Sequence, residues 1–152
     1  MSEMSYRFAE EADLAVLVEL LADDDISGHR EQNAAQILPE YTRAFAEMSR
    51  MPGNRVLLAE SDSEIVGVLQ LVFVPGLTRR GALRAIIEGV RVKSTVRGQG
   101  IGSALIGRAV DEARRAGCAL VQLTSDKRRK RAHLFYRRLG FQQSHEGFKL
   151  EL

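Results

Sequence analysis

An amphipathic segment between two apolar strands most constrains the fold of this chain. Between residues 100 and 116, apolar side chains recur at helical spacing and fall in one half of a helical wheel. That apolar set is Ile101, Leu105, Ile106, Ala109, Val110, Ala113 and Ala116. Gly117 then fits a C-terminal cap. Apolar runs at 82–93 and 119–124 predict a strand on each side, and a strand–helix–strand unit implies a parallel pair of strands.

The remaining elements are expected to complete an α/β fold, classed as α+β in some schemes. A turn-rich tetrapeptide, Ser61 to Glu64, joins two alternating apolar runs and predicts a hairpin. Because the hairpin is antiparallel and the unit around the amphipathic segment is parallel, we expect a mixed sheet. The other predicted elements are strand 5–9, helices 10–22 and 31–50 (the second interrupted or bent near Pro39), strands 55–60 and 65–74, a helix that ends at Leu139, and short strands near 141–143 and 147–150.

The composition of the 152 residues is that of an ordinary globular chain. Hydrophobic residues make up 45%, and the formal net charge is only +2, so no global field favours nucleic acid as a partner. No apolar run is long enough for a membrane span, and the acidic N-terminus is unlike a signal peptide. Cys118 is the single cysteine, which excludes an internal disulfide and favours a reducing, cytoplasmic location. We expect one domain over 1–152.

Three glycines lie at the start of the amphipathic segment, in the run GQGIG at residues 98–102. A dinucleotide fingerprint needs a glycine where Ser103 stands, and a Walker loop needs a lysine that is absent after these glycines. A helix start offers unpaired N–H groups and the positive end of the helix dipole, which favour phosphate, and glycine lets a pyrophosphate approach the backbone. Arg97 adds positive charge. The loop alone is compatible with an anion site or with a tight turn that binds nothing.

The loop and its surroundings resemble the acetyl-CoA-binding segment of GNAT superfamily N-acetyltransferases. The family pattern is a V-x-V strand, a short loop and [RQ]-x-x-G-x-[GA] at a helix start, which Arg97, Gly100 and Gly102 fill. A second family pattern, A-x-x-F-Y-x-x-x-G-F, is similar to AHLFYRRLGF at 132–141. The resemblance is strong over 83–141, and the C-terminal part is also distantly similar to aminoalkylphosphonate N-acetyltransferases. It implies a GNAT fold with a mixed, mostly antiparallel sheet of about six to seven strands and about four helices.

The resemblance also implies acetyl-CoA as co-substrate and assigns its contacts. A bulged strand is expected to receive the thioester, with the N–H of Val90 placed to polarise the thioester carbonyl. Many family members have an asparagine seven residues before the motif tyrosine. Here that position is Arg129, a candidate for contact with a CoA phosphate. The backbone of Val90, Arg91 and Val92 is expected to bind the acetyl and pantetheine parts, and that of Gly98, Gln99, Gly100, Ile101, Gly102 and Ser103 to bind the pyrophosphate.

Two residues are catalytic candidates. Tyr136 matches the family tyrosine that protonates the departing CoA thiolate; without a ligand it would be read as a core aromatic. An alkylammonium acceptor must lose a proton before it attacks the thioester, and Glu88 is a carboxylate within an otherwise apolar strand. Period-two alternation would put Glu88 and Val90 on one face. Glu88 is interpreted as the general base or an acceptor anchor, against the alternative of a solvent-facing or salt-bridged residue. The basic run 127–131 is either a solvated face or a site for the CoA 3′-phosphate.

The acceptor is expected to be a primary amine of a small molecule or peptide, bound among the first two helices, their loop and residues 75–81. Asp23, Asp24 and Asp25 are most simply a solvated loop at the end of a helix, but they could attract a cationic amine; the segment 78–80 with its two arginines could instead favour an anionic acceptor. The competing hypothesis is a non-catalytic acyl-CoA-binding or regulatory module. The resemblance makes a homodimer possible. No metal is expected, because the chain lacks metal-ligand spacing such as H-x-x-x-H or C-x-x-C.

Overall fold

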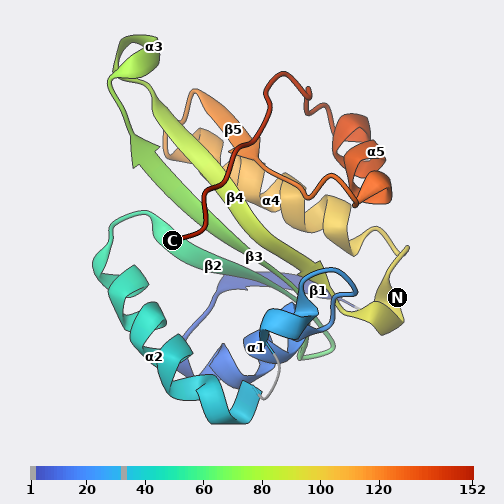
Figure 1. Cartoon of the computed structure of the whole chain (residues 1–152). Helices are drawn as coiled ribbons and strands as arrows, with labels where there is room; N and C mark the ends of the chain where they lie inside the picture. The colour runs from blue at the N-terminus through green and yellow to red at the C-terminus, as the bar shows by residue number, and fades with distance from the viewer. Residues whose placement is uncertain (1–2, 32–33) are drawn as a thin grey trace. The chain divides into compact units, whose positions relative to one another are not determined.

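The computed structural model describes residues 3–31 and 34–152, which form the strands and helices of Figure 1. The chain divides into two compact units, Met1–Gln122 and Leu123–Leu152, with the boundary inside the last strand. A single domain over the whole chain therefore stays a prediction. The strands are β1 Met4–Phe8, β2 Asn54–Ser61, β3 Glu64–Pro75, β4 Leu83–Val92 and β5 Leu120–Leu123; the helices are α1 Leu14–Ala22, α2 Ala34–Arg50, α3 Thr78–Gly81, α4 Ile101–Arg115 and α5 Lys130–Arg138, with 3-10 turns η1 Glu11–Asp13, η2 Gly28–Glu31 and η3 Ser94–Val96.

The five strands form one sheet in the order β1-β2-β3-β4-β5. The first three pairings are antiparallel, and α4 connects β4 to β5, so the sheet is mixed as expected. The predicted hairpin joins β2 to β3: Ser61 faces Glu64, and the two turn residues between them have positive φ. This is the geometry that right-handed strand twist favours in a two-residue turn.

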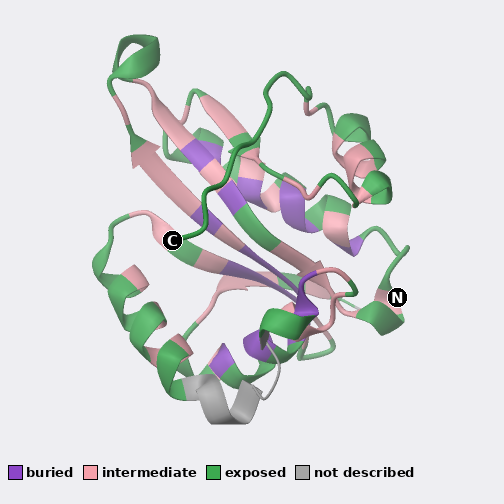
Figure 2. Cartoon of the chain, in the orientation of Figure 1, coloured by how far each residue is buried: buried purple, intermediate pink, exposed green. Residues whose placement is uncertain are grey.

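Helices cover both faces of the sheet in the first unit. Gly67 of β3 lies under α4, because an added Cβ there would meet Ile101 and Leu105 at 3.4 Å. The next residue, Val68, packs instead in a cluster with Leu17 and other leucines of α1. Since successive strand side chains point to opposite faces, α4 and α1 lie on opposite faces of the sheet. The buried positions in Figure 2 accordingly run along the central strands and along one side of α1 and of α4.

The amphipathic segment is the helix that the sequence predicts. Its buried residues are Ile101, Leu105, Ile106, Ala109 and Ala113, all from the predicted apolar half. Gly117 follows with a φ of 81°, and its N–H donates to the Arg114 carbonyl at 3.0 Å, so the predicted C-terminal cap is confirmed. In α2 the helix runs through Pro39 from Ala34 to Arg50. Residues 32 and 33 of the expected second helix lie outside the described residues.

The predicted number of strands and helices is wrong in two places. The described residues contain five strands rather than six or seven, because the segments near 141–143 and 147–150 form no strand. A strand exists only with a pairing partner, and residues 142–152 are exposed along their whole length. A fifth helical segment, α3, stands where a loop was expected. It is a single turn in which Arg79 and Arg80 have left-handed dihedral angles, with φ of 54° and 63°.

Candidate functional site

The donor strand β4 carries a bulge immediately before Val90–Val92. The β3–β4 register shifts between Val68 and Gln70, so that Gly89 and Val90 of β4 lie opposite a single residue of β3. Gly89 has a φ of 61°, which glycine adopts without the steric cost of a Cβ. A bulge takes residues out of the regular ladder and changes the direction of the strand. The bulge implied by the family resemblance is therefore present, and it begins at Gly89.

The end of β4 extends past its neighbour β5. The Ala119 N–H donates to the Leu83 carbonyl at 2.8 Å, so β5 begins beside the first residue of β4. At roughly 3.3 Å per residue, the four residues of β5 accompany only about the first half of the ten-residue β4. Val90–Val92 consequently lies on a part of β4 that has β3 on one side and no strand of the described chain on the other.

The glycine loop leaves the start of α4 open. Gly98 and Gly100 have φ of 80° and 83°, and a Cβ added to either would meet no atom within 4 Å. The glycines are therefore needed for the backbone conformation and not for close packing of protein against protein. Gly100 is the N-cap of α4 and offers no side chain to the first helical N–H groups, which have no acceptor within the helix. This open helix start fits an anionic group such as a pyrophosphate.

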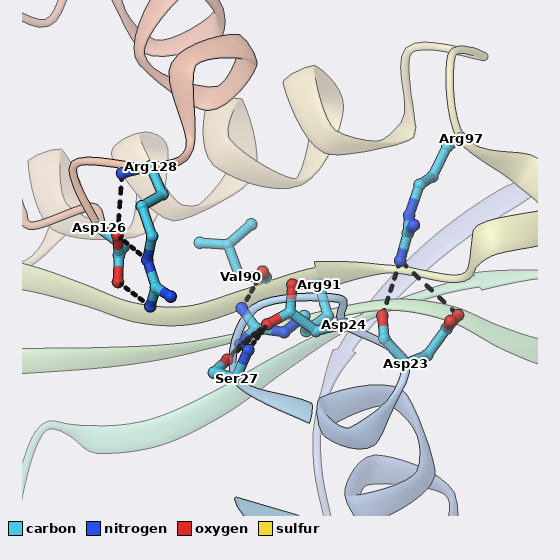
Figure 3. A network of polar contacts seen from close by, with 8 residues as sticks. All are labelled: Asp23, Asp24, Ser27, Val90, Arg91, Arg97, Asp126 and Arg128. Atoms are coloured by element: carbon cyan, nitrogen blue, oxygen red, sulfur yellow. Dashed lines mark hydrogen bonds and ion pairs between the residues drawn. The ribbon is translucent and has the colours of Figure 1, made fainter. Parts of the chain in front are cut away.

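Arg97 does not extend into open solvent in front of the glycine loop. Its Nε donates to the Val92 carbonyl at 3.0 Å, and its Nη2 donates to the backbone carbonyl of Asp23 at 2.7 Å. The Arg97 guanidinium also lies 3.7 Å from the Asp23 carboxylate (Figure 3). The expected positive charge is thus fixed between the loop after α1 and the end of β4.

The aspartates after α1 are engaged by groups on β4 and η3. Asp23 accepts a hydrogen bond from the Ser94 N–H at 2.9 Å, and this bond, with help from the Arg97 charge, lowers the pKa of the Asp23 carboxyl. Asp24 lies 3.5 Å from Arg91. Only Asp25 of the three is exposed. The expectation that all three attract a cationic amine therefore does not fit, because two of the carboxylates already neutralise arginines.

Glu88 is exposed on β4 and lies opposite Gln70 of β3. Period-two alternation is valid only within a regular strand, and Gly89 with its positive φ interrupts the strand between Glu88 and Val90. The spacing of Glu88 and Val90 therefore no longer implies that their side chains lie on the same face of the sheet. An exposed carboxylate beside the bulge is accessible to a bound amine, and a role as base or anchor stays a prediction.

Tyr136 lies in α5, within the C-terminal unit. Its ring makes edge-to-face contacts with Phe135 at 5.1 Å and with Phe141 at 5.8 Å between centroids. The Phe141 N–H donates to the Tyr136 carbonyl at 3.1 Å, which folds the G-F pair back onto the helix end. Gly140, with a φ of 92°, permits this reversal. The spacing of the second motif thus reflects an aromatic cluster that fixes the orientation of the tyrosine ring.

The basic run of the same unit is partly engaged locally. Arg129 is the N-cap residue of α5 and donates its N–H to the Asp126 carbonyl at 2.9 Å. Arg128 binds both carboxylate oxygens of Asp126 (Figure 3), which holds the pKa of that carboxyl well below its usual range. The Nε2 atom of His133 also lies 2.9 Å from the carbonyl oxygen of Asp126.

A positively charged groove of about 540 Å³ lies along α5. Its cationic side chains are Lys130 and Arg137, which lie seven residues apart on one face of α5, and Lys127, which precedes the helix. Gln143 and Glu146 of the C-terminal segment also line it, and Arg137 donates to Gln143. Three cations against one carboxylate make this groove suited to an anion.

A second hollow, of about 310 Å³, lies in the first unit between α2 and β2. Phe45 and Met48 of α2 form one wall, and Val56 of β2 lies on the other. The Arg55 guanidinium sits over the Phe8 ring, 3.3 Å from its centroid, at the edge of the hollow. Of the segments expected to shape the acceptor site, this hollow involves only α2.

Sequence reasoning did not find the partners of Arg91. Its Nη2 donates to the Ser27 Oγ at 2.9 Å, and Ser27 in turn bonds to Asp24. Ser27 is 64 residues from Arg91, so no local spacing could connect them. The sequence held one clue that Arg91 has a charged partner. Arg91 lies between two valines, and an arginine needs a counter-charge if it is to be partly buried.

The comparisons with known proteins cover nearly the whole chain. Residues 14–141 match the acetyltransferase (GNAT) family. An aminoalkylphosphonate N-acetyltransferase of Salmonella typhimurium is 34% identical over 96% of this chain and 88% of the relative. A glucosamine 6-phosphate N-acetyltransferase of Trypanosoma brucei brucei is 32% identical over 99% of this chain and 97% of the relative. Among solved structures, a transcriptional regulator of Bacillus halodurans C-125 superimposes with a TM-score of 0.94 at 45% identity, over 99% of this chain and all of the other.

In the described residues, no helix is both long and apolar enough to span a bilayer. Nor does that part of the chain bring three or more metal-ligating side chains together. Together with the bulged strand, the open helix start and the extent of the family match, the comparisons show that the chain belongs to the GNAT acetyltransferase family and is an acetyl-CoA-dependent N-acetyltransferase.

Proposed function

We propose that the protein transfers the acetyl group of acetyl-CoA to the primary amine of a small molecule by direct attack in a ternary complex. The observation that carries this proposal is the succession of two features along one segment of the chain. The uncovered end of β4 at Val90–Val92 leads directly into the open start of α4 at Gly100. A strand edge and a helix start so connected suit one extended ligand that has amide groups at one end and phosphates at the other.

The glycine loop is assigned to the pyrophosphate. The N–H groups of residues 98–103 include the first ones of α4, which have no intrahelical acceptor. Gly98 and Gly100 keep the approach to these groups free of Cβ atoms. Each of these features stabilises negative charge at the helix start.

The end of β4 is assigned to the pantetheine and acetyl parts. The Lys93 N–H donates to the Val66 carbonyl of β3, so by alternation the peptide groups of Val92 face the uncovered edge. Val90 belongs to the bulge, where backbone groups leave the regular ladder. Its N–H is our candidate for the donor that polarises the thioester carbonyl. Acetyl-CoA supplies an acyl group activated by a thiolate leaving group.

The proton movements are assigned to two side chains. An amine attacks only when neutral, so Glu88 takes a proton from the ammonium directly or through a water molecule. The amine nitrogen then bonds to the acetyl carbon as the carbon–sulfur bond breaks. Tyr136 gives its hydroxyl proton to the departing CoA thiolate. Glu88 retains a second possible role as an anchor for the acceptor, because an exposed carboxylate also attracts an ammonium group.

The acceptor is proposed to carry a phosphate or phosphonate group as well as its amine. The two N-acetyltransferases described above are named for such substrates, an aminoalkylphosphonate and glucosamine 6-phosphate. The cationic groove along α5 offers this chain a site for an anion, which could be this group or the CoA 3′-phosphate.

The single cysteine of the chain is consistent with a protein that works in a reducing compartment such as the cytoplasm.

An acceptor screen that detects the free thiol of CoA tests this function. Matched pairs are used: 2-aminoethylphosphonate against ethanolamine, and glucosamine 6-phosphate against glucosamine. We expect CoA release with amines, and a higher kcat/KM for the phosphorus-bearing member of a pair. Gly100→Glu is expected to abolish acetyl-CoA binding, and Tyr136→Phe to reduce kcat more than it weakens binding. Normal turnover in both variants would refute the proposal.

One observation favours a second candidate, a regulatory module that binds acyl-CoA without catalysis. The solved structure at 45% identity is named a transcriptional regulator. Such a module keeps the glycine loop but needs neither Glu88 nor Tyr136. Acetyl-CoA binding measured by calorimetry, with no CoA release across a broad amine panel, would favour the module over the enzyme.

A further inference from the structure

The loop after α1 is tied to β4 by two parallel sets of contacts, each running from an aspartate through an arginine to a strand carbonyl. In the first set Asp23 pairs with Arg97, and the Arg97 Nε donates to the Val92 carbonyl at 3.0 Å. The backbone of Asp23 takes part as well, because its carbonyl accepts from Arg97 Nη2 at 2.7 Å. The Ser94 N–H donates to the Asp23 carboxylate at 2.9 Å and fixes it from the other side.

In the second set Asp24 pairs with Arg91. The Arg91 Nη1 donates to the Val90 carbonyl at 2.8 Å, and its Nη2 reaches the Ser27 Oγ at 2.9 Å and Asp24 at 3.5 Å. The Ser27 N–H and hydroxyl both donate to the Asp24 carboxylate, at 2.8 and 2.5 Å. This set is the more enclosed of the two: the Asp24 side chain is 9% exposed and that of Arg91 is 18% exposed.

The two carbonyls that the arginines contact are alternate ones, Val90 and Val92, at the end of β4. Figure 3 shows Arg97 extending from the segment after β4 to Asp23, and Arg91 beside Ser27 and Asp24 of the same loop. An arginine head group has a rigid planar donor set, so an aspartate that fixes the guanidinium also fixes the carbonyl that it contacts. No strand of the described chain pairs with this edge, and side chains therefore replace the missing ladder contacts.

We propose that Asp23 and Asp24 are positioning residues for acetyl-CoA, which hold Arg97 and Arg91 against Val92 and Val90 and so set the geometry of the donor strand. The inference rests on the proposed function, since it assigns Val90–Val92 to acetyl-CoA. It removes Asp23 and Asp24 from the set of acceptor ligands. The loop after α1 was expected to border the acceptor. In this inference it instead holds the end of β4, to which acetyl-CoA is assigned, in position.

The test compares Asp23→Asn, Asp24→Asn and the matched control Asp25→Asn, from the same loop. Asp25 is exposed, and no ion pair to it occurs in the described structure. Loss of a positioning contact misplaces a bound ligand, so we expect the Kd and KM for acetyl-CoA to rise about tenfold in the first two variants, with kcat changed less than about threefold. Asp25→Asn is expected to match the wild type, and Asp23→Glu to recover most of the affinity.

Two further measurements keep the outcome decisive. If Asp24→Asn fails to fold, Asp23→Asn with Arg97→Gln forms a double-mutant cycle in which the two effects on acetyl-CoA affinity should not add. A folded Asp23→Asn variant with unchanged acetyl-CoA affinity, or with a raised KM for the amine alone, would overturn the inference. Absence of acetyl-CoA binding by the wild type would instead overturn the proposed function, and this inference with it.

Discussion

Glu88 of β4 faces Gln70 of β3 as the last regular pair before the bulge at Gly89. The carboxylate is thus held by a regular strand on one side, while the backbone beyond it is free to leave the ladder. This arrangement places a base candidate at the boundary between the rigid sheet and the strand end assigned to the thioester.

Glu88→Gln separates the two roles left open for this residue. If Glu88 is the base, kcat should fall by roughly 10²-fold or more, with little change in the KM of either substrate. If it anchors the acceptor, the KM for the amine should rise while the affinity for acetyl-CoA stays the same. Steady-state kinetics with both substrates varied measures this. Glu40→Gln, at an exposed position of α2, is the control, and equal effects in the two variants would exclude both roles.

Gly100→Ala should weaken both the fold and acetyl-CoA binding. A non-glycine residue at a left-handed φ costs about 1–2 kcal/mol, and the added methyl group projects into the open space before α4. Gly107, inside α4 and with open space around its Cα, is the matched position: Gly107→Ala should raise stability by about 0.5–1 kcal/mol. Urea unfolding and calorimetric titration with acetyl-CoA measure the two effects. Tight binding by a folded Gly100→Ala would count against the pyrophosphate assignment.

Local patterns predicted the parts of this structure that depend on local physics. The face of α4 follows from a 3.6-residue period, and the caps at Gly117 and Gly140 follow from the need for positive φ after a helix. The glycine loop was located for the same reason, since a helix start creates unpaired N–H groups wherever it occurs. These features need no knowledge of distant residues.

The errors arose where distant residues decide the outcome. The C-terminal segment has an alternating pattern at Phe148 and Leu150, yet alternation creates a strand only when a partner strand is available. The pairing of Asp23 with Arg97 spans 74 residues and is invisible to spacing. The positive φ of Gly89 also interrupts the alternation between Glu88 and Val90, and a sequence does not reveal which glycine of a strand will adopt a positive φ.

Arg80→Gly should stabilise the turn between β3 and β4. Arg80 has a φ of 63° and lies exposed at the tip of this hairpin, where a side chain adds strain without burial. Glycine removes that strain but loses more entropy on folding, so we expect a net gain of about 0.5 kcal/mol in the free energy of unfolding. Arg43→Gly in α2 is the control and should cost about 1 kcal/mol. A destabilised Arg80→Gly would reveal a stabilising contact of the arginine side chain.

Asp13 should give the protein a pH-dependent share of its stability. Arg7 donates two hydrogen bonds to the Asp13 carboxylate at 2.8 Å, and these bonds, with one from the Glu10 N–H, lower the pKa of the Asp13 carboxyl in the folded state. The unfolded chain therefore takes up this proton at a higher pH than the folded chain does. The stabilisation is complete above the pKa of Asp13 in the unfolded chain, about 4. It is lost as the pH falls through the lower pKa of Asp13 in the folded protein.

The measurement is the free energy of unfolding in urea at pH 7 and pH 3 for the wild type and Asp13→Asn. Asparagine keeps an acceptor oxygen but removes the charge, so the variant should be less stable by about 1 kcal/mol at pH 7, since Arg7 is partly exposed. At pH 3 the difference should be smaller, because the wild type is then below the unfolded pKa. Asp111→Asn, which removes an exposed pair with Arg114, should change stability by less than about 0.5 kcal/mol. An equal loss for Asp13→Asn at both pH values would mean that the charge of Asp13 contributes nothing.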